Sequence, residues 1–182
     1  MRAALHPHLA SPAPAIEITA EVARPAAHRL ALHYAVTGNV GLMRLPDRVR
    51  PHRADGLWQH TCFELFLRAP AEAGYLEFNF APSGEWAAYR FSDYRAGMAP
   101  VETADPQIGS QQEAARYTLA AELDLDAALG LLADLPWHIA LTAVIETLDG
   151  RKSYWSAPHP PGAPDFHHRD CFAIEVPPPK RG

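Results

Sequence analysis

The chain has 182 residues, a length typical of one domain with a core of its own. It carries 16 Lys and Arg against 21 Asp and Glu, a formal net charge of −5, which argues against a nucleic-acid binder that neutralises phosphates. Hydrophobic residues make up 48% of the chain and charged residues 20%, which excludes disorder as the overall state. Because proline is excluded from helix interiors and central strands, the 18 prolines predict short strands and long loops.

The N-terminal stretch does not resemble a targeting signal. Residues 1–15 contain one arginine and lack the continuous apolar run of a secretory signal. No segment approaches the ~18 consecutive apolar residues that a membrane-spanning helix needs. The sequence therefore predicts a single cytoplasmic domain over 1–182, with flexible tails at 1–14 and 177–182.

Two alternating segments begin the predicted fold. Ile16–Val22 and Leu30–Val36 alternate apolar and polar residues, the pattern of strands with one face in a core. Gly38–Gly56 has no sustained period and contains Pro46 and Pro51. We expect this segment to be a long loop.

Three further alternating segments lie close together, over Thr61–Arg68, Tyr75–Ala81 and Trp86–Phe91. The connections between them are short and contain Gly and Pro, which predicts an antiparallel meander. The polar stretch Ser92–Gln112 that follows has no clear period and is expected to be irregular.

The remaining strands are expected over Tyr117–Leu123, Trp137–Ile145 and Cys171–Val176. Ala127–Leu132 is the one helical candidate, and Pro136 limits its far end. About eight or nine strands with one short helix predict an all-β fold, an antiparallel β-sandwich of the jelly-roll or immunoglobulin-like type. No Walker loop, G-x-G-x-x-G, G-x-S-x-G or H-E-x-x-H motif occurs, which disfavours the enzyme classes that carry them.

The turns of the meander predict its register, because opposite residues of an antiparallel pair have a constant sum of positions. When the centre of each turn is placed midway between the two middle residues of that turn, Glu64 lies opposite Asn79 on the neighbouring strand. Glu77 then lies opposite Arg90. One face of the meander is then uncharged and is expected to be core: Phe63, Leu65, Leu67, Leu76, Phe78, Phe80, Ala87, Tyr89 and Phe91. The other face is a polar patch with aromatic residues at its edges: Glu64, Glu77, Asn79 and Arg90 around Ala88, with Phe66 and Trp86.

This patch has the chemistry of a sugar site. A pyranose ring offers apolar C–H faces for aromatic rings and hydroxyl groups for a carboxylate, an amide and a guanidinium. The alternative is a cross-strand ion pair between Glu77 and Arg90 on a solvated face, worth only ~0.2–1 kcal/mol.

The runs Leu57–Leu67 (LWQHTCFELFL) and Tyr75–Gly84 (YLEFNFAPSG) resemble the DOMON-like superfamily, and most of all the bacterial DOMON-like proteins similar to family 9 carbohydrate-binding modules. Tyr94–Met98 (YRAGM) and Pro164–Asp170 (PDFHHRD) are similar to the same group. The resemblance touches residues from about 53 to 172. It implies a β-sandwich that binds sugars in some members and haem in others.

In the sugar-binding modules two tryptophans enclose the sugar, assisted by glutamate and arginine. By position, the resemblance implies that Trp58 is one of these tryptophans and that Glu64 is the assisting glutamate. It implies contact with the sugar more weakly for Trp155, Arg90 and Asn79. Both Trp58 and Trp155 border loops, where a ring can stay accessible for stacking.

No metal site is predicted. Where the related modules usually have acidic residues, this chain has His60–Cys62, so the resemblance does not extend to a calcium site. The densest histidine group, His159, His167 and His168, lacks diagnostic zinc spacing and is expected to anchor loops by hydrogen bonds. Cys62 and Cys171 are expected to be buried thiols, a disulfide between them being the alternative.

Two alternative functions remain. Haem would need axial ligands, for which Met43, Met98 and several histidines are available, whereas C-x-x-C-H for covalent attachment is absent. A glycoside hydrolase could use Glu64 and Glu77, which lie diagonally on one face at ~7–8 Å. However, Arg90 opposite Glu77 would lower the pKa of that carboxyl, which does not suit a general acid.

The sequence thus predicts a non-catalytic domain that binds a small molecule, a carbohydrate or a cell-envelope sugar derivative, without a cofactor, a nucleic acid or a membrane as partner. Its predicted site residues are Trp58, Glu64, Glu77, Asn79, Arg90 and Trp155.

Overall fold

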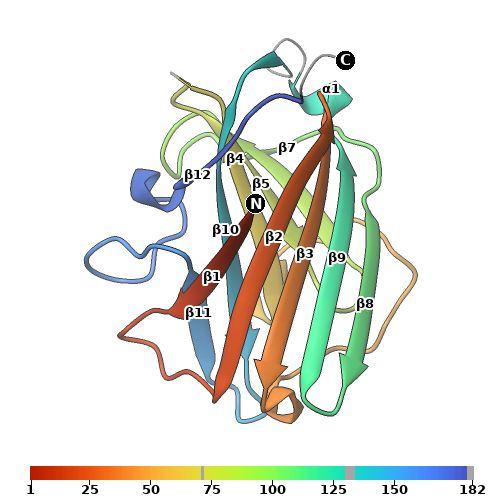
Figure 1. Cartoon of the computed structure of the whole chain (residues 1–182), viewed down its shortest axis with the longest axis vertical. Coiled ribbons are helices and arrows are strands. Elements are labelled where there is room, and N and C mark those ends of the chain that lie inside the picture. The colour runs from red at the N-terminus through yellow and green to blue at the C-terminus, as the bar shows by residue number, and fades with distance from the viewer. Residues whose placement is uncertain (71, 130–133, 180–182) are drawn as a thin grey trace.

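The computed structural model describes residues 1–70, 72–129 and 134–179 and is an all-β structure with almost no helix (Figure 1). Its strands are β1 (Arg2–Pro7), β2 (Ile16–Ala26), β3 (Arg29–Gly38), β4 (Cys62–Arg68), β5 (Tyr75–Phe80), β6 (Trp86–Phe91), β7 (Ala99–Pro100), β8 (Gln107–Glu113), β9 (Arg116–Asp124), β10 (Trp137–Glu146), β11 (Lys152–Ser156) and β12 (Ile174–Val176). Short helices are α1 (Asp126–Leu129) and the 3-10 helices η1 (Val40–Leu42), η2 (Leu57–Gln59) and η4 (Arg169–Cys171).

All strand pairs are antiparallel, in the order β7-β6-β5-β4-β10-β11-β1-β2-β3-β9-β8, with β12 beside β10. The sheet curls so that β2, β3, β9 and β8 form one layer and the strands from β11 to β7 form the other (Figure 1). Strand β1 joins the two layers, because Arg2–Leu5 pairs with β2 and His6–Pro7 with β11. The predicted sandwich is confirmed.

The strand β1 corrects the prediction of a flexible tail over 1–14. Its pairing with β2 buries Leu5, and the Met1 ammonium group donates a hydrogen bond to the carbonyl oxygen of Val22 at 2.6 Å. The short, weakly alternating segment carries little local strand signal, so its partners decide its structure.

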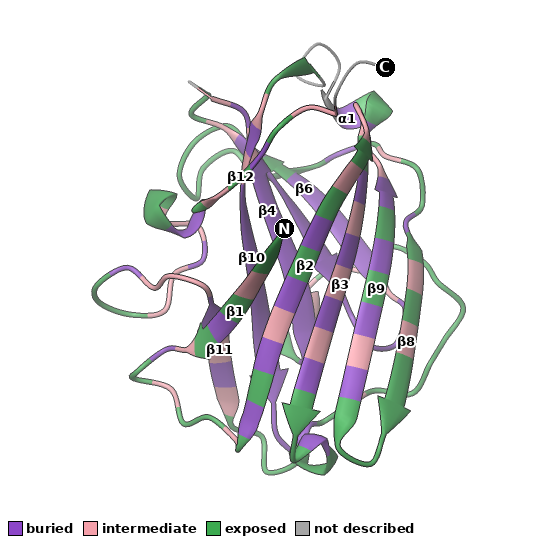
Figure 2. Ribbon diagram, in the orientation of Figure 1, coloured by how far each residue is buried: buried purple, intermediate pink, exposed green. Residues whose placement is uncertain are grey.

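The core lies between the layers. Strands β2, β3 and β9 alternate buried with less buried residues, whereas β4, β5 and β10 are buried almost throughout (Figure 2). Continuous burial means that both faces of these strands are covered. The second face packs in a separate apolar cluster that includes Phe66, Tyr75, Phe91, Phe166 and Phe172.

Trp86–Phe91 has the predicted bounds, and the other strands predicted from alternation are present in whole or in part. Of the predicted strand Cys171–Val176 only Ile174–Val176 is a strand, because Cys171 ends the 3-10 helix η4. Strand β8 was missed inside the segment expected to be irregular, because it is an edge strand with polar, mostly exposed residues. Strand β11 was also missed. The helix begins at Asp126, and the part of its predicted range over 130–132 lies outside the described residues.

The register predicted for the first hairpin is confirmed, with Glu64 opposite Asn79. The register predicted for the second is wrong by one residue, since Glu77 faces Tyr89 and not Arg90. The hairpin closes with a hydrogen bond from the amide of Ala81 to the carbonyl oxygen of Glu85 at 2.9 Å, which leaves a loop of odd length. A glycine at the loop's third position, with a φ of 96°, is typical of such turns.

This one-residue shift exchanges the two faces of β6. Trp86 and Ala88 belong to the core between the layers, and Arg90 lies on the same face at the strand end. The other face instead carries the residues predicted to be core: Ala87, Tyr89 and Phe91.

No helix in the described ranges has the length and apolar character that crossing a bilayer requires.

Candidate functional site

A cleft of about 470 Å³ lies on the face of the β11-to-β7 layer that points away from the main core. Strands β4, β5, β6, β10 and β11 supply its floor, and η2 and two loops supply its walls. The lining combines aromatic, charged and amide side chains: Trp58, Gln59, Glu64, Phe66, Glu77, Phe91, Arg95, Met98, Val144, Lys152, Tyr154, Pro164, Phe166 and His167.

Glu64 is a buried carboxyl group in the floor of the cleft. It is only 2% exposed, and the Thr142 hydroxyl, from the paired strand β10, donates to its Oε2 at 3.0 Å. Burial, and secondarily the charge of Glu77, raise its pKa to about 8, against the opposing hydrogen bond from Thr142. At neutral pH this group therefore holds a proton.

Glu77 lies diagonally from Glu64 on the neighbouring strand and is 5% exposed. The amide Nδ2 of Asn79 donates to its Oε1 at 2.7 Å, and the wholly buried Asn79 also accepts a weak bond from the Cys62 thiol at 3.7 Å. Burial raises the pKa of Glu77, while Asn79 and the more distant charge of Arg95 oppose the rise. The two carboxyl groups, called here the Glu64–Glu77 pair, share one desolvated surface.

His167 borders this pair without supplying a charge. Its Nδ1 lies 2.7 Å from the Tyr75 hydroxyl, which also accepts the backbone N–H of Arg95 at 3.2 Å. In the tautomer with the proton on Nε2, Nδ1 accepts from the Tyr75 hydroxyl and Nε2 lies 3.9 Å from a Glu77 oxygen. Burial, and then the charge of Arg95, lower the His167 pKa to about 4, so the ring is neutral at pH 7.

One ion pair joins the two loops beside the cleft. The Arg95 guanidinium donates to Asp165 Oδ1 at 2.7 Å, and the same oxygen accepts the backbone N–H of His167 at 3.1 Å. Arg95 has a backbone φ of 52°, a conformation that residues other than glycine rarely adopt. The contacts with Asp165 hold the backbone of Arg95 in this conformation. Both loops come from segments that carry the family resemblance.

Trp58 is the exposed aromatic residue of the cleft, with 37% of its surface accessible. Its ring packs edge-on against Tyr89 of β6 at 5.9 Å, and the Tyr89 hydroxyl donates to Asp55 at 2.6 Å. Helix η2 places the ring beside the cleft while leaving part of it free to contact a ligand.

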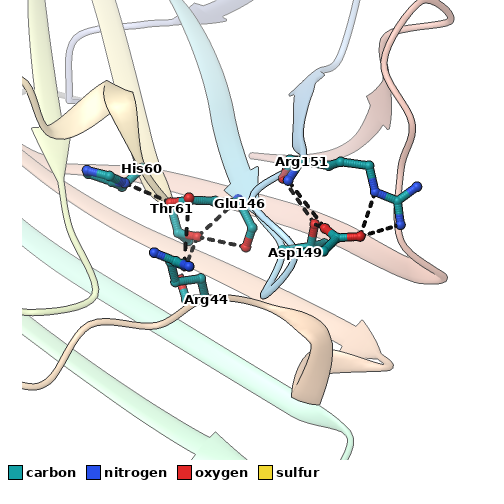
Figure 3. Close-up of polar contacts among 7 residues, drawn as sticks. Arg44, His60, Thr61, Glu146, Asp149 and Arg151 are labelled. Atoms are coloured by element: carbon teal, nitrogen blue, oxygen red, sulfur yellow. Dashed lines mark hydrogen bonds and ion pairs between the residues drawn. The ribbon is translucent and has the colours of Figure 1, made fainter.

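A polar cluster beyond Trp58 attaches η2 to the end of β10 (Figure 3). Glu146 is 5% exposed, with its Oε2 at 2.7 Å from Nδ1 of His60 and its Oε1 at 3.7 Å from Nε of Arg44. The Thr61 hydroxyl donates to the Arg44 carbonyl oxygen at 2.8 Å and accepts the Glu146 backbone N–H at 3.1 Å. These contacts fix the chain immediately after Trp58.

Replacement of Glu146 by alanine is expected to lower the free energy of unfolding by about 1 kcal/mol, because its buried carboxylate loses the contacts with the exposed side chains of His60 and Arg44. Urea denaturation measures this difference. Glu17→Ala is the matched control, since Glu17 is exposed on β2. Equal stability of the Glu146 variant and the wild-type protein would contradict a structural role for the cluster.

The structure brings four of the six predicted site residues together. Trp58, Glu64 and Glu77 line the cleft, and Asn79 lies behind them as the hydrogen-bond partner of Glu77. Arg90 is absent from this face because of the register shift, and it donates instead to the carbonyl oxygen of Ala128 at 2.9 Å. The prediction that Arg90 pairs with Glu77 and lowers its pKa is therefore wrong.

Trp155 also lies away from the cleft. It is 2% exposed in the main core, where its Nε1 donates to the hydroxyl of Ser153 at 2.9 Å. Because residues alternate along β11, its neighbour Tyr154 lines the cleft instead. The prediction of an accessible Trp155 is wrong, since Trp155 itself lies in the paired strand β11 and faces the main core.

Several cleft residues were not among those predicted: Phe91, Arg95, Tyr154, Phe166 and His167. Arg95, Phe166 and His167 lie in segments that carry the family resemblance, which was a usable signal. The contacts that bring those loops to the floor join residues far apart in sequence, such as Tyr75 with His167. Alternation along single strands could not indicate them.

The histidines expected to anchor loops do so. His159 Nε2 contacts the His6 carbonyl oxygen at 2.8 Å, and His168 Nδ1 accepts the backbone N–H of Asp170 at 3.3 Å. Within the described residues, no three His, Cys, Asp or Glu side chains are grouped to hold a metal ion. Cys62 and Cys171 are buried free thiols, as predicted.

No protein-family model matches the chain, and no curated protein matches it. Solved structures match the chain. A candidate carbohydrate-binding protein from Bacteroides uniformis has a TM-score of 0.60 at 14% identity, over 93% of this chain and 84% of that one. A family 9 carbohydrate-binding module from Caldicellulosiruptor kristjanssonii, in complex with glucose, has a TM-score of 0.56 at 10% identity, over 94% and 81% of the two chains. The same kind of module in complex with cellotriose has a TM-score of 0.52 at 10% identity, over 89% and 74%. The chain therefore has the fold of family 9 carbohydrate-binding modules.

Proposed function

We propose that the cleft binds a saccharide and that the protein does not act on it chemically. The observation that carries this proposal is the combination of aromatic rings and buried polar groups in one cleft of about 470 Å³. Trp58, Tyr154 and Phe166 supply apolar contacts for sugar C–H groups, while Glu64 and Glu77 supply hydrogen-bonding partners for hydroxyl groups. The volume lies within the range of small-molecule sites.

The structural comparisons support this proposal through the fold. Two of the similar structures are modules in complex with glucose and with cellotriose. The proposal extends that kind of ligand to this chain and includes a closer relationship with bacterial DOMON-like proteins. The runs Leu57–Leu67 and Tyr75–Gly84 are the sequence basis for that relationship.

Binding without hydrolysis is part of the proposal. Both carboxyl groups of the Glu64–Glu77 pair are at least nine-tenths buried, and burial raises both pKa values. A retaining or inverting hydrolase instead keeps one carboxylate ionised to attack or to activate water. Incubation with a panel of chromogenic glycosides is expected to release no chromophore, and release that Glu64→Gln abolishes would contradict the proposal.

We also propose that the cleft does not hold haem. Met98 and His167 both line it, but His167 has one ring nitrogen bonded to Tyr75 and the other directed at Glu77. Met43 is buried in the main core, away from the cleft. Reconstitution with haem is expected to give no Soret band, and a band lost in the His167→Ala variant would contradict this.

The saccharide proposal predicts that Trp58→Ala lowers affinity at least about 30-fold, because the stacked aromatic surface contributes roughly 2 kcal/mol or more to binding. Isothermal titration with glucose, cellobiose, cellotriose and xylose oligomers measures the affinities. Leu148→Ala removes an exposed apolar side chain outside the cleft and is expected to bind like the wild-type protein. Equal affinity of the Trp58 variant for every ligand that binds, or no binding of any saccharide, would contradict the proposal.

A further inference from the structure

Among the residues that the structure describes, no lysine or arginine lies within ion-pair distance of the Glu64–Glu77 pair. Each carboxyl group receives one hydrogen bond from a neutral side chain, the Thr142 hydroxyl for Glu64 and the Asn79 amide for Glu77. Among the ion pairs of the described residues, none brings a lysine or arginine to either group, and His167 at 3.9 Å is neutral. Buried carboxyl groups are rarely left without a charged partner.

The cations that line the cleft do not fill this role. Arg95 is bonded to Asp165, and its side chain is half exposed. Lys152 stands at the first position of β11, opposite Glu146, and is less buried than either carboxyl group.

The walls of the cleft favour the same kind of charge. The aromatic residues Phe66, Phe91 and Tyr154 line the floor beside the two glutamates, and Trp58 and Phe166 line the walls. The faces of aromatic rings attract ammonium groups, most strongly where water is excluded. One oxygen of the almost completely buried Glu64 has no protein donor and lines this space, so it is available to a ligand.

On the basis of the proposed function, we propose that the saccharide is an amino sugar. Its ammonium group binds at the Glu64–Glu77 pair, among the aromatic rings that line the cleft. The ammonium group supplies the missing counter-ion and donates hydrogen bonds to the free carboxylate oxygens. The proton that Glu64 holds at neutral pH leaves to solvent as the ammonium group enters, since the cation stabilises the ionised pair. Binding is therefore coupled to proton release.

Two matched trimers test the proposal, cellotriose and the β-1,4-linked glucosamine trimer, which differ by an ammonium group in place of a hydroxyl on each ring. Isothermal titration at pH 6, where the amines carry their protons, is expected to show at least about tenfold tighter binding of the glucosamine trimer. The binding heat of this trimer is expected to differ between phosphate and imidazole buffers because protons are released, whereas that of cellotriose is expected to be the same in both. The N-acetylated trimer is expected to bind like cellotriose.

The variants Glu64→Gln and Glu77→Gln keep the shape of the side chains and an oxygen to accept the bonds from Thr142 and Asn79. Each is expected to remove the preference for the glucosamine trimer and the proton release, and to lower cellotriose affinity by a smaller factor, because the amide still offers hydrogen-bonding groups to sugar hydroxyls. Glu85→Gln, a carboxylate outside the cleft, is the control and is expected to change neither.

The possible results separate this inference from the proposed function. Cellotriose binding as tight as glucosamine-trimer binding, or an equal loss of both in the two variants, overturns the amino-sugar assignment and leaves saccharide binding intact. Binding of no trimer at all contradicts the proposed function itself. Thermal unfolding of each variant shows that it is folded.

Discussion

Replacement of Phe63 by alanine is expected to lower the free energy of unfolding by about 3–5 kcal/mol, the largest effect of any single substitution proposed for this protein. Phe63 is completely buried on β4 and contacts the opposite layer, with its ring 5.1 Å from Tyr34 on β3 and 5.8 Å from Tyr117 on β9. The alanine variant leaves a cavity where the two layers meet. Urea denaturation measures the loss.

Two other variants serve as comparisons for the loss of stability expected in Phe63→Ala. Phe63→Leu keeps most of the apolar volume and is expected to cost less than half as much. Trp58→Ala removes a larger ring that is 37% exposed and is expected to change stability by under about 1 kcal/mol. A loss from Phe63→Ala no larger than that from Trp58→Ala would contradict the packing of β4 against β3 and β9.

The stability of the protein is expected to decrease by on the order of 2 kcal/mol as pH rises from 6.5 to 8. The pKa of Glu64 is about 8 in the folded protein and near its usual value of 4.5 in the unfolded chain. Between these values the folded state holds a proton that the unfolded state has lost, so a rise in pH favours unfolding. Above pH 8 both states are ionised at this group, and the decrease ends.

His167 acts in the opposite direction at lower pH. Its pKa is about 4 when folded and 6.5 for the free side chain, so its contribution to stability is lost as pH falls through that range. The effects of His167 and Glu64 oppose each other between pH 4.5 and 6.5, and above pH 6.5 the effect of His167 has ended.

Urea denaturation at several pH values measures the expected decrease. Glu64→Gln has no ionisable group at this position, and its stability is expected to stay level between pH 6.5 and 8. A decrease of the same size in Glu64→Gln and in the wild-type protein would contradict the assignment of the effect to Glu64.

Local alternation was sufficient to predict most strands and the first hairpin of the meander. In β4 and β5 every second residue is large and apolar, and a slip of one position would bury charge. For that reason Glu64, Glu77 and Asn79 could be assigned to one face. The fold class follows from the same pattern.

Alternation alone was insufficient for β6, because both of its faces are apolar. Trp86 and Ala88 on one face and Ala87 and Tyr89 on the other are equally suited to a core. The choice between the faces depends on whether the preceding loop has an odd or an even number of residues. That number was set by the geometry of the turn, and Arg90 was consequently placed on the wrong side.

The amino-acid sequence by itself determined that this chain forms an antiparallel all-β structure and that two glutamates and an asparagine share one face of a meander, because side-chain direction along a strand repeats every two residues. The tertiary structure alone decided that β1 joins the two layers and that Tyr154, rather than Trp155, lines the cleft. It also decided that the two glutamates are buried, with no lysine or arginine of the described residues paired to either, because the burial and charged neighbours of a group depend on segments distant in the chain that pack over it.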